Sequence, residues 1–121
     1  MVKKLNSVIL IIHCAPLSNN AWQAWRVCHS LCTKGYSVLC FFDQAGVAHA
    51  NKPGVIEPGT ENLYSAYTTL SDKQLGGLQL QVCRAAWARR QAGELEQPWA
   101  ASGLVELADA TSNAKRILTF I

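Results

Sequence analysis

A near-continuous aliphatic run close to the start of the chain constrains its fold more than any other feature. The stretch Leu5–Ile12, LNSVILII, ends in five successive aliphatic side chains. A strand with one solvent-facing side alternates between apolar and polar residues, whereas a parallel strand covered on both faces is apolar throughout. We therefore expect residues 5–12 to form a strand of a parallel sheet that helices cover on both faces.

The rest of the chain alternates between strand and helix patterns. We predict further strands at Tyr36–Phe42, Leu78–Val82 and Lys115–Phe120, and helices at Ala21–Thr33, Glu61–Lys73, Arg84–Arg90 and Leu104–Ala110. We expect Asn19 or Asn20 to cap the first helix and Ser102 to cap the last. This alternation predicts an α/β fold, a three-layer α/β/α arrangement with a largely parallel sheet of four to five strands.

Length and composition indicate one globular domain. The chain has 121 residues, of which 50% are hydrophobic and 16% charged, so residues 1–121 suit a single domain with a substantial core. The formal net charge is only +3 and the sequence contains no dense basic run, which argues against direct binding of nucleic acid. The high apolar fraction also hints that other subunits bury part of the surface.

Cysteine usage and the N-terminal residues bear on location. The apolar run Val8–Ile12 is too short for a membrane span or for the core of a secretory signal. The five cysteines are odd in number and show no regular spacing. We therefore expect reduced thiols in a cytoplasmic protein with no membrane contact.

Cys83 lies at the junction of a predicted strand and a predicted helix. The segment Leu78–Gln91, LQLQVCRAAWARRQ, changes at this cysteine from period-two alternation to good helix formers. A helix start offers free backbone N–H groups and the positive end of the helix dipole, and three arginines follow. Such surroundings favour the thiolate, which is the reactive form of a cysteine. The alternative, a small and inert buried side chain, stays open at this point.

Three polar or reactive segments follow predicted strands. They are His13-Cys14, the stretch Asp43–Asn51, and Cys83. Because ligands of open α/β sheets bind beyond the carboxyl ends of the strands, we expect the three segments to converge on one edge.

Other chemistries find less support in the sequence. Cys28-His29-x-x-Cys32 suggests a metal site, but on a helix His29 points about 100° away from the face that the two cysteines share. No second ligand pair occurs, so we expect core thiols and no metal. The glycine-rich nucleotide-binding motifs are absent, and we expect no cofactor.

Four segments resemble the DsrE/TusD sulfur-relay family. They are Phe41-Phe42 with Gly46-Val47-x-x-Ala50-Asn51, then Val82-Cys83-x-Ala85-Ala86-x-x-Arg89-Arg90, then Ser102-Gly103-Leu104-x-Glu106-Leu107-Ala108, and the strand Lys115–Phe120. They occur in the family's order and span Tyr36 to Phe120. Upstream, Ala15-Pro16 stands where the family often has Gly-Pro, and Cys14 is not part of the usual pattern.

The resemblance implies a cytoplasmic sulfurtransferase that carries sulfur as a persulfide on Cys83. Family members act in tRNA thiolation or in the oxidation of stored sulfur. They receive sulfur from a persulfide donor, pass it to a small carrier protein, and form trimers or hexamers of one chain or with sister subunits. Arg84, His49, Asn51 and Cys14 are candidate supporting residues: Arg84 for electrostatics, His49 for proton transfer, and Asn51 as part of the matching loop.

Two alternatives to a sulfurtransferase remain. Some members of the family lack the cysteine and serve only in assembly, although this chain has Cys83 in the expected segment. A general thiol redox protein is disfavoured because the sequence has no Cys-x-x-Cys pair. We also expect Cys14 to lie on the same sheet edge as Cys83. If the first and third strands were neighbours, loop conformation would decide whether the two cysteines can form a disulfide, and the alternative is an incidental thiol beyond a strand end.

Overall fold

A five-stranded sheet forms the centre of the protein. The computed structural model describes residues 7–52, 62–74, 77–90 and 93–121. Its strands are β1 (Ser7–Ile12), β2 (Ser37–Phe42), β3 (Leu78–Cys83), β4 (Trp99–Ser102) and β5 (Arg116–Phe120). Its helices are α1 (Asn19–Thr33), the 3-10 helix η2 (Gln44–Ala50), α2 (Leu63–Gln74), α3 (Arg84–Arg89) and α4 (Leu104–Ser112).

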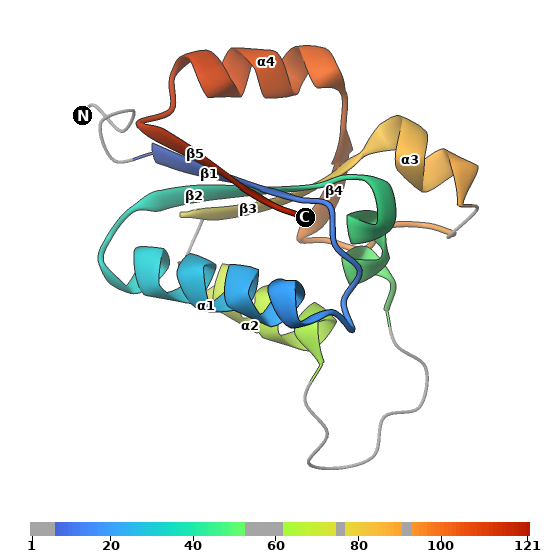
Figure 1. Ribbon diagram of the computed structural model, residues 1–121, viewed down its shortest axis with the longest axis horizontal. Coiled ribbons are helices and arrows are strands. Elements are labelled where there is room, and N and C mark those ends of the chain that lie inside the picture. The colour runs from blue at the N-terminus through green and yellow to red at the C-terminus, as the bar shows by residue number, and fades with distance from the viewer. Residues whose placement is uncertain (1–6, 53–61, 75–76, 91–92) are drawn as a thin grey trace.

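All strand pairs are parallel, in the order β4-β3-β2-β1-β5. Helices α1 and α2 lie against one face of the sheet, α4 lies over the other, and α3 extends from the sheet's carboxyl edge (Figure 1). The expected three-layer α/β/α fold is thus confirmed. Its sheet has five strands and is parallel throughout.

The main core lies between the sheet and the pair α1 and α2. Because side chains alternate along a strand, every second residue of β1 (Val8, Leu10 and Ile12) belongs to this core. Cys28 of α1 is fully buried beneath β2, and its Sγ lies 3.7 Å from the Sγ of Cys40. Toward the carboxyl ends of the strands the core becomes aromatic, with Phe42, Tyr67 and Trp99 in contact.

The opposite face of the sheet is covered far less completely. No residue of α4 is buried. Leu104 and Val105 at its start are 66% and 74% exposed, and Ile117 of β5 is 44% exposed. A parallel sheet is ordinarily covered on both faces, so this side of the molecule is unusually open.

Two elements were not predicted from the sequence, and two predicted helix caps were wrong. The strand β4 was not predicted, because its sequence WAAS is short and poor in strand formers. The segment after β2 forms the helix η2. Ser18 caps α1, its hydroxyl accepting a hydrogen bond from the N–H of Ala21, and Gly103, rather than Ser102, occupies the cap position of α4.

The remaining boundaries agree to within a few residues. Leu5 and Asn6, expected in the first strand, and Glu61, expected to start a helix, lie outside the described residues.

Candidate active site at the carboxyl edge of the sheet

Cys83 is both the last residue of β3 and the N-cap residue of α3. Its backbone is extended (φ −63°, ψ 119°), and its side chain makes no capping hydrogen bond. The side chain of the cap residue therefore accepts no hydrogen bond from the backbone N–H groups in the first turn of α3. These N–H groups lie next to the thiol. Only 7% of the Cys83 surface is exposed. The predicted strand-to-helix junction is present, with the cysteine at its turning point.

The segment Ser102-Gly103 lies directly beside Cys83. Ser102 ends β4 and is the register partner of Cys83. A Cβ placed on Gly103 would lie 2.8 Å from Oε1 of Glu106 and 3.3 Å from Nη1 of Arg84. A larger residue at this position would thus displace both charged side chains. The structure brings two segments that are distant in sequence together around one thiol.

The helix η2 crosses the carboxyl edge of the sheet next to this junction. It begins after Asp43, whose Oδ1 accepts a hydrogen bond of 2.7 Å from the N–H of Gln44. Gln44 has a φ of +53°, a left-handed conformation that non-glycine residues seldom adopt. Gly46 lies so close to the end of β1 that an added Cβ would collide with the carbonyl oxygen of Ile12. Only glycine allows η2 to pack this tightly on the sheet.

His49 belongs to this helix and is 1% exposed. Its Nε2 lies 3.1 Å from the carbonyl oxygen of Cys14. A carbonyl only accepts, so Nε2 carries the proton and Nδ1 is left as an acceptor, with no partner among the described residues. Burial lowers the pKa of His49 to about 4, although the bond to Cys14 acts in the opposite direction. The imidazole is therefore neutral at pH 7 and packs against the rings of Phe42 and Tyr67.

Cys14, whose carbonyl oxygen accepts the hydrogen bond from His49, is also buried. The thiols of Cys14, Cys28 and Cys40 belong to the same buried core as Tyr67. Burial, and then these thiols, raise the pKa of Tyr67 well above its usual range.

The expected proximity of Cys14 to Cys83 required β1 and β3 to be neighbours. Strand β2 lies between them. Two strand spacings amount to about 9.6 Å, which exceeds the Cα separation of a disulfide. A direct bond between the two thiols would need backbone movement at the strand ends.

Asn51, the fourth candidate, is exposed at the end of η2. With His49 and five other residues (Pro16, Ala48, Asn62, Leu63 and Tyr64) it lines a cavity of about 170 Å³. The first residues of α2 form the opposite wall. Asn51 and His49 thus share one cavity, whereas Arg84 lies with Cys83 and Gly103.

Cys28 and Cys32 lie in the core on one face of α1, as the helical spacing predicts. The hydrogen bond with Cys28, followed by burial, raises the pKa of Cys32 far above its usual range. Trp87 likewise packs, and its indole Nε1 donates a hydrogen bond of 2.9 Å to the carbonyl of Gly93. In the described part of the chain no group of His, Cys, Asp and Glu side chains is arranged to hold a metal ion.

Three residues around the site were missed from sequence. Ser102 was taken for a helix cap and for part of a motif, because the strand it ends was not recognised. Gly46 was noted only as part of a motif, since its close approach to β1 depends on strand order. Tyr67 was covered only by the predicted helix Glu61–Lys73, and nothing in the sequence indicates that its buried hydroxyl has no partner among the described residues.

Comparisons with known proteins agree with this architecture. The model of the DsrE/DsrF-like family matches residues 6–120. The crystal structure of the ychN protein from E. coli superposes with a TM-score of 0.81 at 19% sequence identity, covering 95% of this chain and 99% of that one. At this identity the likeness shows the fold alone. No curated protein matches the sequence significantly. Among the described helices, none is both long and apolar enough to cross a membrane.

Proposed function

Because the chain belongs to the DsrE/DsrF-like family, whose members are generally related to sulfur relay, we propose that it is a sulfurtransferase that carries sulfur as a persulfide on Cys83. The position of Cys83 at the junction of β3 and α3 is the observation that carries this proposal. Cys28, Cys32 and Cys40 are buried more deeply than Cys83, and a raised pKa keeps Cys32 protonated and unreactive.

The reaction is a thiol exchange without net oxidation. The thiolate of Cys83 attacks the outer sulfur of a donor persulfide, R–S–SH. A new sulfur–sulfur bond forms on Cys83 while the donor's bond breaks, and the donor leaves as the thiolate R–S⁻. An acceptor thiolate then attacks the outer sulfur on Cys83 and regenerates the Cys83 thiolate. Protons exchange with water, and no cofactor takes part.

The surroundings of Cys83 support both half-reactions. The persulfide is an anion near neutral pH, and backbone N–H groups in the first turn of α3 are suitable donors to it. The exposed guanidinium of Arg84 adds positive charge on the same side. Because Cys83 is only slightly exposed, a slender terminal sulfur reaches it more readily than a bulky electrophile does.

His49 plays no part as a proton shuttle in this scheme. It is neutral and buried, and its N–H is already donated to Cys14. We assign it a positioning role, since it ties η2 to the loop that follows β1. Asn51 is exposed and remains a candidate for contact with the partner protein.

The open face around α4 supports assembly into an oligomer. Leu104 and Val105 are exposed apolar residues that follow directly on Gly103, next to Arg84. Exposed apolar patches of this kind mark protein–protein contacts. We propose a trimer or hexamer, of this chain alone or with sister chains, in which α4 is buried.

The proposed partners are a protein persulfide donor and a small sulfur-carrier protein in the cytoplasm. The sulfur would serve 2-thiouridine formation in tRNA or intracellular sulfur oxidation. The chain itself would not bind the nucleic acid.

A labelling experiment tests the proposed function. The protein is incubated with glutathione persulfide carrying ³⁵S in the outer position, and the labelled peptide is mapped by mass spectrometry under non-reducing conditions. We expect one labile sulfur on Cys83, none on the Cys83→Ser variant, and unchanged labelling of Cys14→Ser as the matched control. Equal labelling of Cys83→Ser and wild type would refute the assignment. A wild-type chain that takes no label yet assembles with sister chains would instead identify an assembly subunit.

A further inference from the structure

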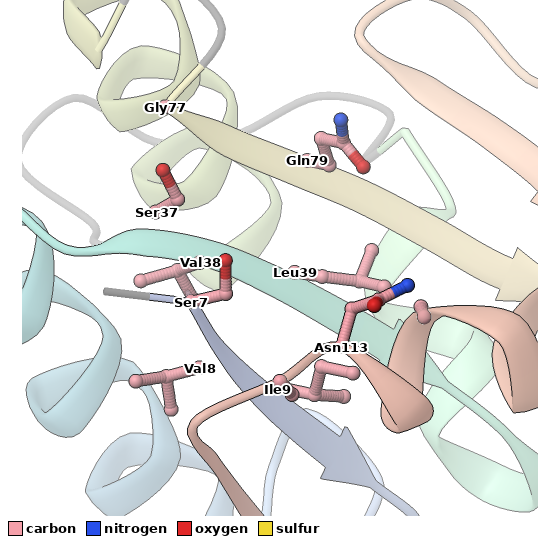
Figure 2. A pocket seen from close by; sticks show the side chains of 11 residues that line it. Ser7, Val8, Ile9, Ser37, Val38, Leu39, Gly77, Gln79 and Asn113 are labelled. Atoms are coloured by element: carbon pink, nitrogen blue, oxygen red, sulfur yellow. The ribbon is translucent and has the colours of Figure 1, made fainter. Parts of the chain in front are cut away.

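A groove of about 370 Å³ lies at the amino ends of β1, β2 and β3 (Figure 2). Cys83 lies at the opposite end of β3. The sheet forms its floor and the C-terminal end of α4 forms its roof. Its lining consists of Ser7, Val8, Ile9, Ser37, Val38, Leu39, Gly77, Gln79, Ala110, Asn113 and Ala114. The volume is within the range of small-molecule sites in proteins, which begins at roughly 300 Å³.

Small side chains on both sides keep the groove open. Ser37 and Gly77 lie on the floor, and Ala110 and Ala114 on the roof. None of these side chains is long enough to cross between helix and sheet. The groove also stays open because α4 does not pack closely on the sheet, as no residue of that helix is buried.

The polar groups of the groove offer donors and acceptors but no charge. The Gln79 carboxamide is exposed and forms no hydrogen bond with the rest of the described chain. Asn113 donates one N–H to the carbonyl of Asp109 at 3.2 Å, so its oxygen and a second N–H stay available. Ile9 and Leu39 supply apolar surface between these groups. Figure 2 shows Gln79 coming from β3 and Asn113 from the end of α4.

Two features disfavour a charged ligand. Among the described residues, no Lys, Arg, Asp, Glu or His lines the groove, so an ion would lose hydration without gaining a counter-charge from them. The C-terminal end of α4 also carries the negative pole of the helix, with no basic residue in its last turn, and so repels anions.

We propose that this groove binds an uncharged small molecule through a carboxamide or lactam edge. Such an edge presents one N–H beside one C=O, which match the acceptor and donor of a side-chain carboxamide. The aliphatic floor takes the apolar part of the molecule. This binding does not depend on the sulfurtransferase activity, because Cys83 lies at the other end of the strands.

Benzamide and benzoate form a matched pair of probes, equal in shape and different in charge and donor capacity. Titration of the ¹⁵N-labelled full chain, followed by NMR, should give millimolar binding of benzamide. Shifts should be confined to the lining residues and include the side-chain NH₂ signals of Gln79 and Asn113. Benzoate should bind at least tenfold more weakly. No benzamide shifts at the groove, or equal shifts with benzoate, would overturn the proposal.

Three variants test whether benzamide binds in the groove. Ala110→Leu fills the space from the roof, and Ala108→Leu adds the same group to the exposed side of the same helix as its control. Gln79→Leu removes the carboxamide at an exposed position, where the fold tolerates the change. We expect Ala110→Leu and Gln79→Leu each to weaken benzamide binding at least tenfold and Ala108→Leu to leave it unchanged. Binding that is unaltered by both groove variants would refute the assignment.

Discussion

The imidazole Nε2 of His49 donates a hydrogen bond to the carbonyl oxygen of Cys14 across 3.1 Å, inside the protein. This bond joins η2 to the loop that connects β1 and α1. Either protonation state of the ring can donate this bond, so burial of the ring, and not the bond, opposes protonation of His49.

His49 should make the protein sensitive to acid. Its pKa is lowered from 6.5 to about 4 in the fold, so as pH falls below 6.5 the unfolded state binds a proton that the folded state does not. The free energy of unfolding should fall by roughly 2–3 kcal/mol between pH 7 and pH 4.5 from this group alone. Urea denaturation of wild type and His49→Gln at both pH values measures the difference. An identical loss in the two proteins would contradict this account.

Tyr67→Phe should not destabilise the protein. The Tyr67 hydroxyl is buried and has no partner among the described residues, so its removal costs no hydrogen bond. We expect a change of about 0 to 1 kcal/mol in the stabilising direction. Thr68→Val on the same helix is the contrast, since the Thr68 hydroxyl accepts the Trp99 indole N–H at 3.0 Å. That variant should lose about 1–3 kcal/mol by chemical denaturation. A large loss of stability in Tyr67→Phe would show that the hydroxyl has a hydrogen-bond partner.

Gly46→Ala should be one of the more damaging single substitutions. The added methyl would collide with the backbone carbonyl of Ile12, so η2 or the end of β1 must move. We expect a loss of roughly 2 kcal/mol or more in thermal or urea unfolding. Ala45→Gly, its neighbour in η2, should cost about 1 kcal/mol at most. If the two changes cost the same stability, the loss would come from backbone flexibility and not from the lack of space at Gly46.

Lysine at both Leu104 and Val105 should break the proposed oligomer. Burying a leucine-sized side chain contributes about 1.5–3 kcal/mol, so losing two per subunit should weaken association at least a hundredfold. Sedimentation velocity at micromolar concentration should show a shift to monomer. Leu17→Lys changes an even more exposed leucine away from α4 and should leave the assembly intact. A double variant that sediments like wild type would place the interface elsewhere.

The long elements of the fold follow directly from sequence patterns. The aliphatic strand β1 and the amphipathic helix α1 are recognisable because their periodicity matches their environment. The strand β4 escaped recognition, because Trp99-Ala-Ala-Ser102 gains its extended form from pairing with β3 and not from its own propensity. Local sequence carries little information about an edge strand of four residues.

The candidate site was predictable in its centre and not in its surroundings. A strand that runs directly into a helix fixes the place of Cys83, so its position was inferred from sequence. Strand order has no local signature, and it decides that β2 separates Cys14 from Cys83. The burial of His49 likewise depends on how η2 folds back over Phe42, which no pattern within η2 specifies.

The register of β1 and β5 has a consequence for synthesis of the protein. Ile9 near the start of the sequence pairs with Ile117 near its end, and the carbonyl of Phe120 accepts the N–H of His13 at 2.8 Å. A nascent chain that has not passed residue 115 therefore exposes one whole side of β1, the most aliphatic strand, as an unpaired edge. Such edges recruit other chains. Aggregation therefore competes with folding after α4 has been synthesised and before the ribosome has released β5.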